Sequence, residues 1–361
     1  MNVHQIAVIP GDGIGPEVIK ESIKILEKIK PLLKQPLNFK EFDLGAKQYL
    51  KTKEAMPLSV WNELIQSDVV MLGAVGDPSV PPGILEREVL LKIRFELDLY
   101  INLRPCILYD GVFTPIKNKN PKDIQFVVVR ENTESVYSGI GGVFKKGTLD
   151  EVSIQEDINT RKGVERCIRY AFEYCKNRNY KNSITLVDKA NVLTHAHQLW
   201  RRVFESVGTE YSQIKRNALY VDAAAMDFIR RPEIFDVLVT NNIFGDIITD
   251  LGAIVSGGLG MAASANMNPD AKKSKVKQCA ALFEPIHGSA PDISGQGLAN
   301  PIAAILAAKM MLEFLDETVA ANGIDQAIKK AIQSGKVFKP ESSDLLVSTS
   351  AIGDIVSSFV S

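Results

Sequence analysis

The sequence has few of the features that indicate a secreted, disulfide-linked, zinc-binding or membrane protein. It contains 4 cysteines among 361 residues, and they form neither a C-x-x-C pair nor a pattern with histidine at zinc-ligand spacing. No apolar run reaches the roughly 18 residues that a membrane span needs. The first residues, MNVHQIAVIPGDG, lack the basic start and long apolar run of a signal or transit peptide. We therefore expect a protein of a reducing compartment, the cytoplasm, without a membrane partner.

An excess of charge of either sign is also missing. The 42 Lys and Arg residues nearly balance the 43 Asp and Glu residues, for a net charge of −1. This balance argues against a nucleic-acid partner, which requires a basic face. The one dense basic run, KKSKVK at 272–277, is expected to be a solvated loop. The apolar fraction of 45% is ordinary for a globular protein with a sizeable core.

The hydrophobic pattern predicts an α/β fold with much parallel sheet, because short β-rich runs alternate with helical patterns. The β-rich runs lie at 6–10, 69–72, 124–130, 184–189, 218–223 and 235–240. Helices are expected at 16–29, with Pro16 at the first helical position, and at 300–315, with Asn300 as the cap and Pro301 just inside. Residues 138–160 are expected to form a β-hairpin that projects as an arm.

The glycine-rich stretch PGDGIGPE at 10–17 is not the dinucleotide-binding fingerprint. That fingerprint is G-x-G-x-x-G, whereas the third glycine here comes one residue too early and proline follows it at once. A tight turn that leads into a helix is the better interpretation. A ligand could still approach this backbone in another way.

Three arginines, Arg94, Arg104 and Arg130, lie near the ends of predicted strands or helices. A planar guanidinium group matches a carboxylate with two parallel hydrogen bonds, so a small dicarboxylate would use two or three of them. The alternative is that each arginine pairs with a nearby acidic residue.

Two aspartates, Asp246 and Asp250, interrupt the otherwise apolar segment TNNIFGDIITD at 240–250. If this segment is helical they share one face, and two like charges there repel unless a cation lies between them. Asp222, at the end of the run ALYVDA, could supply a third carboxylate. Oxygen ligands without nearby Cys or His favour Mg²⁺ or Mn²⁺ over zinc. The alternative is a helix cap and a surface acid.

Other candidate side chains are ambiguous when taken singly. Lys189 follows a predicted strand and either points into solvent or enters a site with a shifted pKa. Tyr137 is either a packed aromatic with a solvated hydroxyl or an acid. His195 and His197 match no metal pattern, and we interpret them as surface or core histidines.

Taken together, the motifs resemble the β-decarboxylating dehydrogenases, a family that includes isopropylmalate, isocitrate, homoisocitrate and tartrate/D-malate dehydrogenases. The resemblance runs over nearly the whole chain. It rests on IPGDGIGPEV, GAVGDP, LLKIRFELDLYINLRP, RENTESVY, VDKANVL, NNIFGDIITDLGA and FEPIHGSAPDISGQGLANP. It implies two α/β domains, residues 1–99 plus 252–361 and residues 100–251, in a homodimer with composite active sites.

The resemblance also implies roles for individual residues. Arg94, Arg104 and Arg130 match the family's clamp for substrate carboxylates, and Tyr137 matches its proton-donating tyrosine. Lys189 matches the lysine that reaches the neighbouring subunit's site, and Asn191 and Val192 of the same motif are expected at the substrate. The metal ligands would be Asp246, Asp250 and, from the partner subunit, Asp222, which is also expected to act in catalysis. A regulatory subunit without activity would be expected to lack some of these residues, and here every position is filled.

The resemblance favours NAD as the cofactor, because Asp292 falls where the family contacts the adenosine ribose. A carboxylate there accepts a hydrogen bond from a 2′-hydroxyl and repels a 2′-phosphate, whereas the NADP-dependent relatives carry a Lys-Tyr pair. The other expected cofactor contacts are Ala74, Glu284, His287, Gly288, Ser289, Ala290 and Asn300.

The substrate is suggested by the segment EREVLLKIR, which places Leu90 and Leu91, with Glu88 nearby, where the family contacts the C3 substituent. Two leucines suit an isopropyl group, whereas a carboxylate there would lose water without gaining a partner. Burying three methyl-sized groups contributes about 2 kcal/mol, enough to prefer 3-isopropylmalate over malate by more than about tenfold.

This interpretation predicts oxidation and decarboxylation of 3-isopropylmalate to 2-oxoisocaproate and CO₂, a reaction of leucine biosynthesis. The motif RENTES at 130–135 is closer to the isocitrate and tartrate relatives. The alternative is therefore a D-malate/tartrate dehydrogenase, followed by an NAD-dependent isocitrate or homoisocitrate dehydrogenase.

Overall fold

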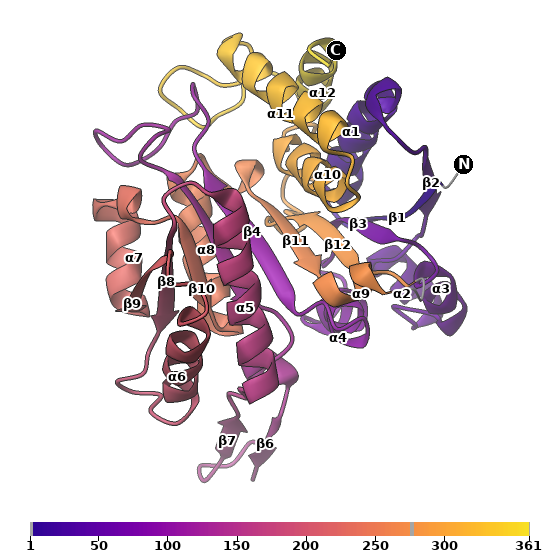
Figure 1. Cartoon of the computed structure of the whole chain (residues 1–361). Coiled ribbons are helices and arrows are strands. Elements are labelled where there is room, and N and C mark those ends of the chain that lie inside the picture. Colours follow the sequence, from indigo (N-terminus) through magenta and orange to yellow (C-terminus); the bar gives the residue numbers. More distant parts are fainter. Residues whose placement is uncertain (1–2, 275–277, 361) are drawn as a thin grey trace.

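The computed structural model describes residues 3–274 and 278–360, and within them a ten-stranded sheet forms the centre of the fold (Figure 1). The strand order is β2-β1-β3-β12-β11-β4-β5-β10-β8-β9. The strands are β1 (His4–Gly11), β2 (Leu37–Glu41), β3 (Val69–Ala74), β4 (Ile101–Ile107), β5 (Gln125–Glu131), β8 (Ser183–Asp188), β9 (Lys215–Tyr220), β10 (Val237–Thr240), β11 (Ala263–Met267) and β12 (Ala281–Pro285).

The helices pack on both faces of this sheet, which is why strands such as β3, β10, β11 and β12 are buried along their whole length. The longer helices are α1 (Gly15–Lys28), α5 (Arg161–Arg178), α6 (Ala196–Gly208), α7 (Val221–Arg230), α8 (Asn242–Val255), α10 (Ile302–Phe314), α11 (Thr318–Gln333) and α12 (Thr349–Ser358). The shorter helices are α2 (Ala46–Thr52), α3 (Leu58–Leu64), α4 (Lys92–Glu96) and α9 (Pro269–Lys273), and a π-helical turn, Glu86–Leu91, leads directly into α4.

The α/β prediction is confirmed, but the sequence analysis did not predict strands β2, β4, β11 and β12 or the antiparallel centre of the sheet. Both ends of the sheet are parallel, but β4 runs antiparallel to its two neighbours, β5 and β11, and β11 also runs antiparallel to β12. Strands from the two chain ends, β1, β3, β11 and β12, lie together beside α1, α10, α11 and α12 (Figure 1). The sheet continues without a break into the middle of the chain, and the division into two domains stays a prediction.

One predicted strand is partly wrong. The run 218–223 was expected to be strand throughout, but β9 ends at Tyr220 and α7 begins at Val221. The three alanines after Asp222 are strong helix formers, and an acidic residue is favourable in a first helical turn. Asp222 therefore lies at the start of a helix.

Two smaller expectations also need correction. Helix α10 begins at Ile302, so Pro301 precedes the helix, although the Asn300 side chain does accept a hydrogen bond from the Ile302 amide at 3.1 Å. In the basic run, Lys272 and Lys273 form the end of α9 and are not in a loop, because the Asn268 side chain caps the start of that short helix. Residues 275–277 of the run lie outside the described residues.

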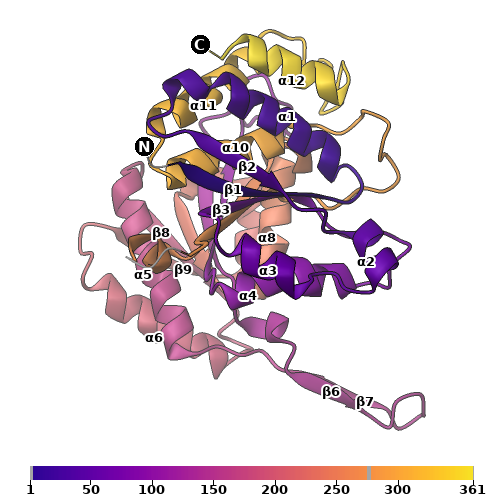
Figure 2. The same ribbon diagram turned by 90° about the vertical axis from the view of Figure 1, so that its right-hand side faces the viewer.

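The predicted hairpin is confirmed. Strands β6 (Gly141–Phe144) and β7 (Val152–Gln155) pair antiparallel and extend from the body of the molecule (Figure 2). All eight strand residues are exposed. Such a two-stranded hairpin is marginally stable by itself. We therefore expect the hairpin to pack against another protein surface.

The glycine-rich turn adopts the tight conformation expected for it. Gly11 and Gly13 have φ angles of 74° and 58°, in the left-handed region that favours glycine. A Cβ on Gly13 would lie 1.9 Å from the carbonyl oxygen of Ser289, so only glycine fits at this close approach. Asp12 ties the turn to two other loops, because its carboxylate accepts hydrogen bonds from the amides of Ala46 (2.8 Å) and Gly76 (3.0 Å).

Within residues 3–274 and 278–360, no helix is both long enough and apolar enough to cross a membrane.

Candidate active site

Three buried arginines from different elements meet at one point above the middle of the sheet. Arg94 comes from α4, Arg104 from β4 and Arg130 from the end of β5, and each is at most 5% exposed. Arg130 pairs with Asp246, and the Arg104 Nη2 lies 3.3 Å from the same carboxylate. Arg94 donates instead to Glu284, at 2.9 Å. We call these three residues the arginine cluster.

The two aspartates of the segment 240–250 face this cluster. Asn241 caps α8, its side chain accepting a hydrogen bond from the Phe244 amide at 3.1 Å. The helix then presents Asp246 and Asp250 on one side, and Arg104 lies within 3.9 Å of Asp250 as well as near Asp246. The expectation of a shared face is therefore confirmed. The alternative, in which one aspartate is the helix cap, is wrong, because the cap is Asn241.

The electrostatic environments of the two aspartates differ. Burial opposes ionisation of Asp246, but Arg130 and Arg104 lower its pKa to about 2. Burial raises the pKa of Asp250, and the negative charge on Asp246 adds to that shift. A divalent cation would relieve the repulsion between them, and the carboxylate oxygens are ligands of the type that Mg²⁺ and Mn²⁺ prefer. The donor set therefore fits such an ion but supplies two protein ligands from this chain.

A third carboxylate is not brought to the pair. Across residues 3–274 and 278–360, no three His, Cys, Asp or Glu side chains are grouped so that they could hold a metal ion. Asp222 instead pairs with Lys189 at the surface, 2.6 Å from its Nζ, and this hydrogen bond lowers the pKa of Asp222. Asn191 and Val192 are exposed in the turn that follows Lys189. These four residues form a second, outward-facing group.

Tyr137 joins the first group. Its hydroxyl donates a hydrogen bond to Asp246 at 2.7 Å, and the Arg130 guanidinium lies 5.2 Å from its ring centre. Burial raises the pKa of Tyr137, although Arg130 opposes the shift. The phenol therefore carries its proton at neutral pH and is able to donate it.

Sequence reasoning missed two buried asparagines beneath the arginine cluster, Asn102 in β4 and Asn266 in β11. They are directly opposite each other across the strand pair, and Arg104 Nε donates to Asn102 Oδ1 at 2.8 Å. Asn266 in turn donates to Glu284 at 2.9 Å. The signal in the sequence was an asparagine inside each otherwise largely apolar strand, because an uncompensated amide is unfavourable in a core.

The two histidines of the THAH segment have different surroundings. His197 is buried and its Nδ1 accepts a hydrogen bond from the Lys189 amide at 3.1 Å, whereas His195 is exposed. The expectation of core or surface histidines is confirmed. His197 also contacts Asn241, which links the Lys189 turn to the capped end of α8.

Most of the expected cofactor residues lie along one loop that follows β12, whereas Glu284 lies within β12 and Ala74 at the end of β3. Ser289 accepts a hydrogen bond from the Ile14 amide, and the Ala74 carbonyl accepts one from Asp12, so both are held against the glycine-rich turn. Asp292 is exposed. Gly288 and Ala290 flank Ser289 in the loop, and Ala290 has a φ angle of 40°.

This loop has an unused polar atom that fits a bound ligand. The Nε2 of His287 is buried and has no hydrogen-bond partner, and burial lowers the pKa of this histidine. Asn300 lies at the end of the loop. Glu284 differs from the other expected contacts, because it is buried and accepts hydrogen bonds from Arg94 and Asn266.

The two leucines expected at the substrate lie in the π-helical turn before α4, a type of distortion frequent at functional sites. Leu90 is half-buried and packs against a core cluster that includes Leu85 and Val89. Leu91 is also half-buried, yet among the described residues it packs against none of the buried clusters. Glu88 is exposed. Leu91 is therefore the leucine that remains free to contact a ligand.

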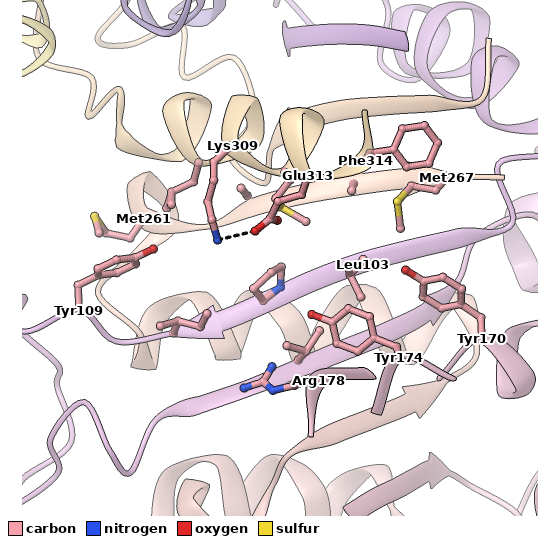
Figure 3. A pocket seen from close by; sticks show the side chains of 17 residues that line it. Leu103, Tyr109, Tyr170, Tyr174, Arg178, Met261, Met267, Lys309, Glu313 and Phe314 are labelled. Carbon is pink, nitrogen blue, oxygen red and sulfur yellow. Dashed lines mark ion pairs between the residues drawn. The ribbon is translucent and has the colours of Figure 1, made fainter. Parts of the chain in front are cut away.

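A separate cavity of about 290 Å³ lies on the opposite face of the sheet (Figure 3). Leu103 and Pro105 of β4 line it, whereas Asn102 and Arg104 point to the other face, since side chains alternate along a strand. Helices α5 and α10 form its walls, with Tyr174 and Lys309 among the lining residues. The cavity is therefore distinct from the arginine cluster.

The chain is similar to known proteins along nearly its whole length. A family model described as isocitrate/isopropylmalate dehydrogenase matches residues 5–357. A curated protein from Thermobifida fusca (strain YX), named 3-isopropylmalate dehydrogenase, is 51% identical over 329 residues, which is 91% of each chain. A protein of the same name from Nocardia farcinica (strain IFM 10152) is 48% identical over 342 residues, covering 94% of this chain and 98% of its own. Among solved structures, isocitrate dehydrogenase from Methylococcus capsulatus aligns over 99% of both chains with a TM-score of 0.87 and 36% identity.

Proposed function

The chain belongs to the isocitrate/isopropylmalate dehydrogenase family, and from that premise we propose that it oxidises and decarboxylates 3-isopropylmalate with NAD, yielding 2-oxoisocaproate, CO₂ and NADH in leucine biosynthesis. The observation that carries the proposal is the meeting of Asp246 and Asp250 with three buried arginines at one point. The names of the relatives that are 45–51% identical support the choice of substrate.

The arginine cluster binds the two carboxylates of the substrate. Within the cluster, the Nε of Arg94 is a buried donor without a hydrogen-bond partner. A buried donor without a partner is unfavourable, so a ligand carboxylate stabilises it. Leu91 ends the π-helical turn that leads into α4, the helix that carries Arg94, and it contacts the isopropyl group of the substrate. A third substrate carboxylate at this position would be unfavourable, because it would lose water without gaining a partner.

Asp246 and Asp250 would hold Mg²⁺ or Mn²⁺ together with the partner subunit's Asp222. A divalent cation bound there supplies Lewis-acid chemistry toward the substrate oxygens. In the single chain the Asp246 carboxylate pairs with Arg130 and lies 3.3 Å from Arg104, so a metal ion bound there would share this carboxylate with the two arginines.

Two proton transfers are assigned to this chain's own side chains. Lys189, with Asp222 2.6 Å from its Nζ, helps remove the proton from the C2 hydroxyl. The loop 286–300 would hold NAD, which would supply a hydride acceptor for C2. After loss of CO₂, Tyr137 protonates C3, since its raised pKa keeps the phenol protonated beforehand.

We infer a homodimer, because the Lys189 group faces away from the arginine cluster of its own chain. Apolar side chains are exposed on α7 and α8, the neighbouring helices that carry Asp222 and Asp246. They are Met226 (53%), Ile229 (42%), Ile247 (60%) and Ile254 (47%). An exposed apolar surface of this kind is typical of a protein interface. The hairpin β6–β7 also exposes Val143, Phe144 and Ile154, and it would pack in the same assembly.

The test is a spectrophotometric assay of NADH formation by the purified protein. Turnover is compared on 3-isopropylmalate, D-malate, tartrate and isocitrate, with NAD and then NADP, and with and without Mg²⁺ or Mn²⁺. We expect metal-dependent turnover that is highest on 3-isopropylmalate with NAD. Faster turnover on D-malate or tartrate would assign the other substrate class, and turnover that survives a chelator would remove the metal site from the proposal.

A further inference from the structure

A continuous chain of buried hydrogen bonds connects two members of the arginine cluster through the sheet. Arg94 donates to Glu284, which also accepts from Asn266, and Asn102 donates to Asn266 Oδ1 at 2.7 Å. The Asn102 Oδ1 then accepts from Arg104 Nε at 2.8 Å. Each of these five residues is at most 7% exposed. The positions of two guanidinium groups on different elements are therefore coupled by direct contacts.

Asn266 is the centre of this chain, and its side chain uses all of its hydrogen-bonding capacity. The Oδ1 accepts from Asn102 and, at 3.0 Å, from Asn132, while the Nδ2 donates to Glu284 and to the Leu282 carbonyl at 3.3 Å. Two acceptor and two donor positions are the full capacity of an amide. A fully satisfied buried amide has one favourable orientation, so it fixes its neighbours.

Side-chain packing from the other face is incomplete at this point. Leu103 and Met267, which adjoin Asn102 and Asn266 along their strands, line the 290 Å³ cavity between α5 and α10 (Figure 3). The same strands are thus backed by open space at this point. A gap in the packing removes the contacts that would otherwise hold the strands in place. On the face opposite the cavity, the hydrogen bonds of Asn102 and Asn266 therefore hold the two strands in place.

We propose that Asn266 and its cross-strand partner Asn102 are positioning residues that fix the spacing between the Arg94 and Arg104 guanidinium groups, and so set the length of the dicarboxylate that the site accepts. This inference rests on the proposed function, in which both arginines bind substrate carboxylates. Because 3-isopropylmalate shares a four-carbon backbone with malate and succinate, we expect the site to prefer succinate over the five-carbon glutarate.

The experiment compares the wild type, Asn266→Ala and a matched control, Asn132→Ala. Asn132 is also buried and also donates to Asn266 Oδ1, but its other contact is the Leu99 carbonyl and it contacts no arginine. Binding of succinate and of glutarate is measured by calorimetric titration, and kcat and KM are measured for 3-isopropylmalate and for NAD.

For Asn266→Ala we expect succinate affinity to fall about tenfold, as for loss of a hydrogen bond to a charged group. The preference for succinate over glutarate should shrink toward one. The KM for 3-isopropylmalate should rise by a similar factor, with kcat and the KM for NAD within about twofold of the wild type. Asn132→Ala should keep the succinate preference, whatever it does to thermal stability.

Equal effects of the two variants on succinate affinity, or an unchanged succinate preference in Asn266→Ala, would overturn the inference while the proposed function stands. A wild-type protein that binds neither diacid and oxidises no 2-hydroxy dicarboxylate would remove the proposed function itself. If Asn266→Ala does not fold, Asn266→Ser and Asn102→Ser retain a hydroxyl and carry the same expectation.

Discussion

At the scale of the residue, Tyr137 is the side chain whose role is easiest to isolate, since its hydroxyl has one partner, Asp246, at 2.7 Å. Tyr137→Phe removes the proton donor and leaves the arginine cluster in place. We expect NADH formation in the first turnover to persist while steady-state kcat falls by about 10²- to 10⁴-fold, the range for loss of a general acid. Rapid-mixing absorbance at the NADH band measures both quantities. A hydride step slowed by the same factor as kcat would contradict the assignment.

Leu91 and Leu90 provide a second comparison at this scale. Leu91→Ala should lower the preference for 3-isopropylmalate over malate, as the ratio of kcat/KM values, by about tenfold, because about 0.8 kcal/mol is lost for each methylene no longer covered. Leu90 packs against the core, so Leu90→Ala should lower the melting temperature more than Leu91→Ala does. An unchanged substrate ratio in Leu91→Ala would place the isopropyl group elsewhere.

Charged residues in the site were easier to predict from the sequence than neutral ones. Arg104 and Asp246 are charged groups inside apolar segments, and such groups need a partner or a ligand. Asn102 and Asn266 are 164 residues apart, and they meet only because β4 and β11 pair antiparallel. Local sequence does not determine that register, so the link between them could not be predicted.

At the scale of the element, the cap of α8 determines where Asp246 and Asp250 lie. Asn241→Ala removes this cap and should lower the free energy of unfolding by about 1 kcal/mol. Ser348→Ala is the matched control, because Ser348 caps α12 with the same type of hydrogen bond. Urea unfolding should show similar losses for both variants. A raised metal concentration for half-maximal activity is expected for Asn241→Ala alone, and an equal metal requirement in the two variants would contradict this role of the cap.

Glu131, the last residue of β5, should make the free energy of unfolding depend on pH. Burial raises the pKa of Glu131 to about 7, although the amides of Thr133 and Glu134 donate hydrogen bonds to its carboxylate. Between the usual pKa of a glutamate in the unfolded chain and about pH 7, Glu131 binds a proton in the folded state but not in the unfolded state. Its contribution to the free energy of unfolding therefore falls as pH rises through this range. Above about pH 7 the contribution is constant.

Glu131→Gln removes this titration. The difference in unfolding free energy, variant minus wild type, should therefore increase between pH 5 and pH 7 and then level off. Any lost hydrogen bonds appear as a constant offset. Urea unfolding at a series of pH values measures the difference, and a value that does not change with pH would show that Glu131 titrates normally.

At the scale of the whole molecule, the sequence predicted the fold class and most strands, since apolar runs and turns are local features. It did not predict the antiparallel segment β5-β4-β11-β12 at the middle of the sheet, which depends on pairing between distant segments. That segment brings Arg104, Arg130 and Glu284 together. The cytoplasmic location and the two-domain division remain predictions from the sequence.

The residues that are expected in one active site fall into two separate groups in the single chain, which indicates a dimer. Asp246 and Asp250 lie with the arginine cluster, whereas Lys189 and Asp222 pair with each other at the surface. In a symmetric dimer each site would combine the first group of one subunit with the second group of its partner. Each active site would therefore be shared between two subunits.

Mixing two inactive variants tests this claim most directly. Asp222→Asn and Asp246→Asn proteins are unfolded together, refolded and assayed for NADH formation with 3-isopropylmalate. Because half of the randomly formed dimers are hybrids, each with one intact site, we predict recovery to about a quarter of the wild-type activity. Each variant refolded alone should remain inactive. Activity of the mixture no higher than that of the separate variants would show that each site is built within a single chain, and would contradict the account.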